Sequence, residues 1–145
     1  MLDPLNTDWA IAEGHTGEYP YQVRFRKLPR TFDCSGHTKR LNVFWSMASS
    51  SNKGMATTDE LGRLHVFEER LVNAVEYDGS AILAAVLTGR GEREFVYYVH
   101  DAQDFVARLS NMPHEAERYP IELHAADDPE WEYYKSIIPP TAEPT

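Results

Sequence analysis

The stretch AILAAVLTGRGEREFVYYVHD, residues 81–101, decides the fold of this chain. An apolar run and an aromatic run are joined by Gly89-Arg90-Gly91, and a short glycine-bearing link between two such runs predicts a β-hairpin. The link lacks the GxxxxGKS/T pattern and leads into a strand, so we interpret it as a turn and not as a phosphate loop. We expect residues 94–100 to form an inner strand and residues 81–88 to lie nearer an edge.

Four other segments are predicted strands, because apolar and polar residues alternate along them. Tyr21, Val23 and Phe25 share one face of the strand at residues 21–26, and a short strand at residues 9–12 completes an N-terminal hairpin. The remaining strands are predicted at residues 40–47 and 120–126.

The longest predicted helix begins at a capping box, Thr57-Thr58-Asp59-Glu60. In this motif the Thr57 hydroxyl accepts from the Glu60 amide, while the Glu60 side chain reaches back to the Thr57 amide. We expect the helix to run to about Glu76. Its apolar residues recur at three- and four-residue spacing and would form the buried stripe: Leu61, Leu64, Phe67, Leu71 and Val75.

Two shorter helices are predicted further along the chain. Asp101 is the expected N-cap of the first, which would pack through Phe105, Val106 and Leu109. Asp128 is the expected N-cap of the second, with Pro129 at its first helical position. Trp131 and Tyr134 of this last helix would pack on the sheet.

The order of these elements predicts the fold class. From residue 40 onward it is strand, helix, strand, strand, helix, strand, the ferredoxin-like βαββαβ order of an α+β domain. The N-terminal hairpin would extend one edge of an antiparallel sheet, and the last helix would pack nearby. We expect two helices on one sheet face and an open face opposite. We expect one domain over residues 1–145, with an ordered core at about 8–139 and loose termini.

Charge and composition restrict the partners that we expect. There are 14 Lys and Arg against 23 Asp and Glu, a formal net charge of -9. Such a surface repels nucleic-acid backbones and anionic membranes, whereas it suits a basic protein partner or simply solubility. The lone Cys34 excludes an intrachain disulfide, and the N-terminus does not resemble a signal peptide, so we expect a cytoplasmic protein.

The candidate site residues are weakly signalled. Tyr98 and His100 alternate onto one face of their strand, as Glu122 and His124 do on theirs. If both faces are the open one, the four side chains could converge to hold a metal or to supply an acid and a base. The alternative is that each is simply hydrated, and we expect no catalytic residue, metal or other cofactor.

Three other residues are candidate site residues: Arg90, Arg93 and Cys34. Arg90 and Arg93 are candidate contacts to an acidic partner. Cys34 has His37 three residues on, but no third group completes a nucleophilic site.

Several short motifs together resemble one family. They are Trp9, Glu68-Glu69, Gly91-Glu92-Arg93, the Tyr97-Tyr98-Val99-His100-Asp101 run, the closing DPEWEYY at residues 128–134, and Pro139. The set is similar to the bacterial domain of unknown function 695 family over about residues 8–139. The resemblance implies a bacterial protein without established activity or catalytic residues. More distantly, the compact acidic α+β layout resembles the regulator of ribonuclease activity B, a protein inhibitor of a nuclease.

These observations lead to three hypotheses. The preferred one is a non-enzymatic protein-binding or regulatory domain, for example an inhibitor or immunity-type protein for a basic partner. The alternative is a small metal-binding protein or enzyme that uses the set Tyr98, His100, Glu122 and His124. The third is an oligomerising module whose exposed sheet edges pair, so that the chain is a monomer or a homodimer.

Overall fold

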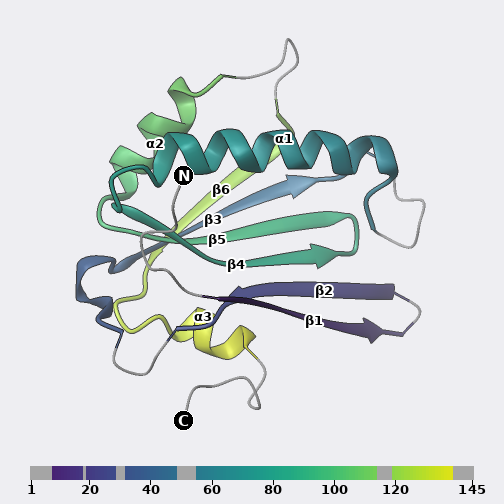
Figure 1. Cartoon of the computed structure of the whole chain (residues 1–145), viewed down its shortest axis with the longest axis horizontal. Coiled ribbons are helices and arrows are strands. Elements are labelled where there is room, and N and C mark those ends of the chain that lie inside the picture. The colour runs from purple at the N-terminus through teal and green to yellow at the C-terminus, as the bar shows by residue number, and fades with distance from the viewer. Residues whose placement is uncertain (1–7, 18, 29–31, 49–54, 114–118, 139–145) are drawn as a thin grey trace.

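The computed structural model describes residues 8–17, 19–28, 32–48, 55–113 and 119–138, which form one antiparallel sheet with helices on both faces (Figure 1). The strands are β1 Trp9–Thr16, β2 Tyr19–Arg26, β3 Lys39–Ser46, β4 Ala81–Gly89, β5 Glu92–Val99 and β6 Ile121–Asp127. The helices are α1 Thr58–Val75, α2 Ala102–Asn111 and α3 Glu132–Ile137, with a 3-10 turn, η1, at Cys34–Gly36.

The sheet has the strand order β1-β2-β4-β5-β3-β6. β3 and β5 are inner strands, as the sequence predicts, and the N-terminal hairpin pairs with β4 through β2. Gly89-Arg90-Gly91 is confirmed as a turn. Arg90 has φ 53° and Gly91 φ 79°, the left-handed pair that a two-residue type I′ hairpin turn requires.

One sheet face is covered by α1 and α2, as predicted. Phe67 of α1 packs between the rings of Trp45 and Phe95, and Phe105 of α2 packs on Tyr97. The predicted stripe of α1 is buried except for Leu61, which is 45% exposed.

The reason for the exposure of Leu61 lies in the residue before it. Glu60 turns inward, where its carboxylate accepts from Trp45 Nε1 at 3.0 Å and from the amide of Ala48 at 2.8 Å. Only half of the predicted capping box forms, the bond from the Glu60 amide to the Thr57 hydroxyl. A buried indole N–H needs an acceptor, and supplying it takes Glu60 away from its expected role and turns Leu61 outward.

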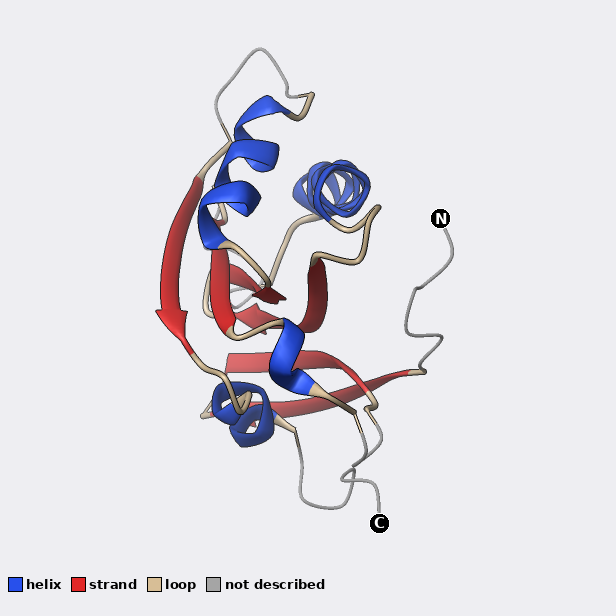
Figure 2. Ribbon diagram, turned by 90° about the vertical axis from the view of Figure 1, so that its left-hand side faces the viewer, coloured by secondary structure: helices blue, strands red, loops and turns tan. Residues whose placement is uncertain are grey.

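The prediction of an open second face is wrong over β4 and β5. Trp131, Tyr134 and Ile138 form a second core there with residues of the sheet that include Val96 and Tyr98. Figure 2 shows α3 lying against this side of the sheet, opposite the longer helices. The face carrying α3 is called the α3 face below.

The last helix begins later than predicted. Its N-cap is Trp131 and not Asp128 as predicted, but the Asp128 side chain accepts from the amides of Glu132 at 2.8 Å and Tyr133 at 3.1 Å, four and five residues away. Residues 128–131 make a turn, and Trp131 has a left-handed φ of 58°. Trp131 and Tyr134 pack on the sheet, as expected. No helix in the described residues has the length and apolar character needed to cross a lipid bilayer.

Candidate functional site

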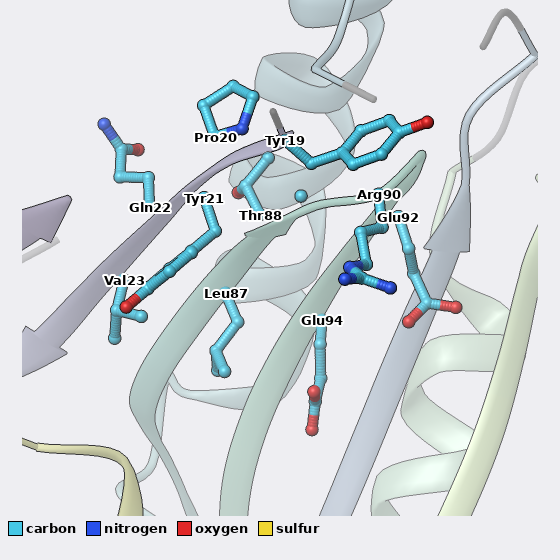
Figure 3. A pocket seen from close by; sticks show the side chains of 11 residues that line it. Tyr19, Pro20, Tyr21, Gln22, Val23, Leu87, Thr88, Arg90, Glu92 and Glu94 are labelled. Carbon is cyan, nitrogen blue, oxygen red and sulfur yellow. The ribbon is translucent and has the colours of Figure 1, made fainter. Parts of the chain in front are cut away.

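A pocket of about 220 Å³ lies on the α3 face, between the start of β2 and the β4–β5 turn (Figure 3). Its floor is apolar, from Val23 and Leu87, which are cross-strand partners. Figure 3 shows tyrosines on the β2 side and two carboxylates on the β5 side. The lining residues are Tyr19, Pro20, Tyr21, Gln22, Val23, Leu87, Thr88, Gly89, Arg90, Glu92 and Glu94.

Two glycines shape this pocket. Gly89 stands between Tyr21 and Glu92 in one row of the sheet, and a Cβ there would lie 3.1 Å from Tyr21 Cβ. Tyr21 leans over Gly14 of β1, where a Cβ would lie only 2.5 Å from its hydroxyl oxygen. Because Gly89 and Gly14 have no side chains, the pocket above Leu87 stays open.

The β5 side of the pocket is acidic. Partial burial and the nearby carboxylates of Glu94 and Glu122 raise the pKa of Glu92 above its usual 4.5. Glu122 belongs to this group because it shares a row with Glu94, across Phe44 of β3. Three like charges at one end of the sheet repel each other, so a cation placed among them would be stabilised.

Of the lining residues that the structure describes, Arg90 is the one with a positive charge. Its guanidinium lies over the Tyr19 ring, 5.9 Å from the centroid, so the rim of the pocket already contains a cation–π contact. Arg90 is exposed, and among the described residues no ion pair joins it to Glu92 or Glu94.

A hydrogen-bond network holds Glu94 in place from below. Its Oε2 accepts from Asn42 Nδ2 at 2.6 Å and from the Tyr133 hydroxyl at 2.7 Å. Arg40 donates to Asn42 at 2.9 Å and lies over the Tyr133 ring. The network joins the pocket to α3, and the other oxygen of Glu94 accepts no hydrogen bond from a described residue.

The network continues to Tyr98 and Asp128 but is poorly suited to acid–base chemistry. The Tyr98 hydroxyl donates to Asp128 Oδ2 at 2.7 Å. Burial, and then the bonds to Asp128 and Glu94, raise the pKa of Tyr98 and of Tyr133 well above 10. Burial acts to raise the pKa of Asp128, but Tyr98, two backbone amides and Arg40 together hold it below 3.8. None of the three changes protonation near neutral pH, and the bonds they make join α3 and the segment before it to β5.

The structure does not bring the sequence-predicted set together. Tyr98 is fully buried under Trp131, whereas Glu122 and His124 are exposed on β6. Strand pairing puts Tyr98, Glu122 and His124 on the same sheet face, but β3 separates β5 from β6. His100 is exposed beyond the end of β5. Among the described residues no group of three or more His, Cys, Asp or Glu could hold a metal ion.

The remaining candidate residues also lie apart from one another. Arg90 lies at the pocket, whereas Arg93 is on the opposite face and donates to the Thr88 hydroxyl at 2.9 Å. His37 contacts the carbonyl of Gly79 at 2.7 Å, and its other ring nitrogen has no hydrogen-bond partner among the residues that the structure describes. Burial raises the pKa of the Cys34 thiol, so the thiol is not an activated nucleophile.

Sequence reasoning missed the pocket residues Tyr19, Tyr21, Glu92 and Glu94 as a site. Alternation alone placed Tyr21 and Val23 on one face of their strand. What it could not supply was the register that sets Tyr21 opposite Gly89 and Val23 opposite Leu87. A glycine facing an aromatic residue across two strands was the available signal.

These features define an α+β domain with a six-stranded antiparallel sheet and a polar-rimmed pocket on one face. The chain belongs to a family of unknown function, DUF695, whose family model matches residues 7–138. The match confirms the family predicted from the sequence motifs. No curated protein and no solved structure matches the chain.

Proposed function

We propose that this chain is a non-enzymatic protein-binding domain whose pocket receives a lysine or arginine side chain of a basic partner. The observation that carries the proposal is the division of the pocket into an apolar floor, Val23 and Leu87, and an acidic side, Glu92 and Glu94. Lysine and arginine have a matching division, an aliphatic stem and a cationic head.

The size of the pocket supports a single side chain as its occupant. Pockets that hold drug-sized ligands have volumes of about 300–1,000 Å³, and this one has about 220 Å³. The stem would lie along Leu87 beside the tyrosines, and the head would reach Glu92 and the unused oxygen of Glu94. The net charge of -9 favours the approach of a basic surface and accelerates association.

The architecture supports a binding role on a rigid platform. We infer that β3 to β6, with α1 and α2, form a ferredoxin-like unit that the β1–β2 hairpin extends, and the pocket lies where the two parts join. A regulatory role of the inhibitor or immunity type follows naturally, since an acidic domain that captures basic side chains can cover a basic functional surface.

Blocked tripeptides test the proposal by calorimetric titration. Gly-Lys-Gly and Gly-Arg-Gly should bind weakly, with a Kd on the order of 1 mM, or about −4 kcal/mol. Gly-norleucine-Gly has the stem without the charge and Gly-Glu-Gly has the opposite charge, so neither should bind measurably. Equal binding of the lysine and norleucine peptides would contradict the proposal.

A matched pair of variants tests whether the lysine peptide binds through the charge of Glu92 or only through the net charge of the chain. Glu92→Gln should lower the affinity for the lysine peptide several-fold, because an exposed ion pair contributes about 0.2–1 kcal/mol. Glu69→Gln removes the same charge from an exposed position on α1, and it should leave the affinity unchanged. Equal losses in both variants would show that only the net charge attracts the peptide.

A further inference from the structure

The strand β6 is an edge of the sheet, and no described strand pairs with its outer side. It stands last in the strand order and pairs with β3 on its inner side. In Figure 2 it is the outermost strand, leading down towards α3. Residues 122–125 are all exposed, and the pairing with β3 continues without a bulge from Ile121 to Asp127.

The hydrogen bonds between β6 and β3 show which backbone groups of β6 point towards β3 and which point outward. Ser46 donates to the carbonyl of Pro120 and Asp128 donates to the carbonyl of Thr38, both at 2.9 Å. In an antiparallel ladder the hydrogen-bonded residues alternate, so 122, 124 and 126 face β3. The N–H and C=O groups of Leu123 and Ala125 therefore point away from the sheet, available to another strand.

The side chains of β6 are complementary to themselves. In an antiparallel pair centred on Leu123, the two copies of Leu123 form a hydrogen-bonded pair, which their outward groups allow. Glu122 of each copy then lies opposite His124 of the other, and Ile121 lies opposite Ala125. Leu123, which is 37% exposed, would contact its own copy. A register centred on His124 would instead set the two histidines opposite each other.

The other edge strand, β1, has such a match only near its end, where a pair centred on Gly14 would span residues 12–16 and set Glu13 opposite His15. Lys27 donates to the carbonyl of Asp8 at 2.8 Å, so Trp9, Ile11 and Glu13 present the outward groups there. A pair centred on Ile11 would set Ala10 opposite Ala12 and Trp9 opposite Glu13, with no opposite charges in register.

We propose that two copies of this chain associate by antiparallel pairing of β6 with β6, about a two-fold axis at Leu123. The two sheets then become one continuous sheet, with two Glu122–His124 pairs across the junction. Because opposed residues lie on the same face, the axis is perpendicular to the sheet and both α3 faces look the same way. Two pockets would then act on one partner surface, a consequence that rests on the proposed function, whereas the dimer does not.

Sedimentation velocity and a cysteine cross-link test the pairing without any peptide. The protein should sediment with twice its chain mass of 16.6 kDa at high concentration. In a Cys34→Ser background, Leu123→Cys should form an intermolecular disulfide under mild oxidation. Paired residues there would have Cα atoms about 5.5 Å apart, within the usual disulfide range. Ile11→Cys is the matched control at the other edge, and it should stay uncrosslinked.

A charge exchange tests the register. Glu122→Lys should weaken dimerisation about tenfold, because in each of the two cross-strand pairs the carboxylate that accepts from His124 is replaced by an ammonium group that cannot accept. The double variant Glu122→Lys/His124→Glu should restore it. A second test is Leu123→Pro, which removes an outward N–H and leaves the pairing with β3 intact, and which should give a monomer with an unchanged circular dichroism spectrum.

Three results would overturn the inference. They are a monomer at every concentration, a cross-link at Ile11→Cys in place of Leu123→Cys, and a double variant as weak as Glu122→Lys alone. Each is obtained without a basic peptide, so failure of the dimer and failure of the pocket are distinguishable.

Discussion

Trp131 stacks on Tyr98, with ring centroids 4.1 Å apart and planes 9° from parallel. The indole N–H of Trp131 donates to the carbonyl of His37 at 2.8 Å, and the Tyr98 hydroxyl donates to Asp128. This pair fixes the segment before α3 to the inner strand β5. It thereby positions Tyr133, which holds Glu94 at the pocket.

Trp131→Ala should destabilise the fold by about 3–5 kcal/mol, because it removes a fully buried aromatic side chain. Urea unfolding followed by circular dichroism measures the change. Glu130→Ala, an exposed neighbour, should change the stability by less than about 0.5 kcal/mol. A loss from Trp131→Ala no larger than that of the control would show that α3 is not fixed through this stack.

Asp128 should make the fold sensitive to acid. Its pKa is lower in the folded state than the usual 3.8, so its contribution is present above that value and lost as the pH falls below it. Asp128→Asn should therefore lower the unfolding free energy at neutral pH and flatten its fall in acid. Asp59→Asn, at an exposed position of α1, should leave the acid profile as it is.

Glu92 should affect the pH dependence of stability in the opposite direction to Asp128. Its pKa is raised in the folded state, so its stabilising contribution exists below 4.5 and is lost as the pH rises through the raised value. Glu92→Gln should therefore be more stable than the parent chain at neutral pH, with no difference in strong acid. A gain in stability together with weaker peptide binding is typical of a functional residue. A loss of stability at neutral pH would contradict this role.

Arg90 combines two effects that a pair of variants can separate. Its left-handed φ of 53° costs a residue with a side chain about 1–2 kcal/mol. Arg90→Gly should relieve this cost and stabilise the hairpin, whereas Arg90→Ala should not. Both remove a cation from the rim, so both should strengthen binding of the lysine peptide. Weaker binding of the lysine peptide in both variants would mean that the Arg90 side chain supports the bound peptide and does not repel its cation.

The central hairpin could be predicted from the sequence because its signals are local. Gly89-Arg90-Gly91 sits between two runs with strand composition, and the structure has its turn there. The inner position of β3 and β5 followed from the order of the elements. The helix starts at Thr58 and Ala102 followed from Thr57 and Asp101, whose side chains accept from the amides of their first turns.

The errors arose where a tertiary contact overrode a local preference. Glu60 turns inward to the indole of Trp45, a contact between a helix and a strand that no local pattern shows. Asp128 reads as the N-cap of a helix beginning at Pro129, but Trp131 takes a left-handed conformation and packs on Tyr98. Trp131 and α3 cover the α3 face through these contacts, so the alternation of side chains along β5 could not predict that this face is covered.

The candidate site shows the same limit. Tyr98, Glu122 and His124 alternate onto the face on which the structure has them, yet β3 separates them and Trp131 covers Tyr98. The pocket depends instead on the register of β2 against β4 and on Gly14, which leaves room for Tyr21. Register across strands that are distant in sequence is set by packing, which composition does not show.

A map of backbone amide shifts in the ¹⁵N-labelled protein tests the binding site most directly. Titration with blocked Gly-Lys-Gly should move the amides of Thr88, Gly89, Glu92 and Glu94 along one saturable curve, while Gly-norleucine-Gly moves none of them. Saturable shifts centred on the acidic residues Glu130 and Glu132 at the start of α3, or no saturable shift at the pocket, would contradict the proposed function.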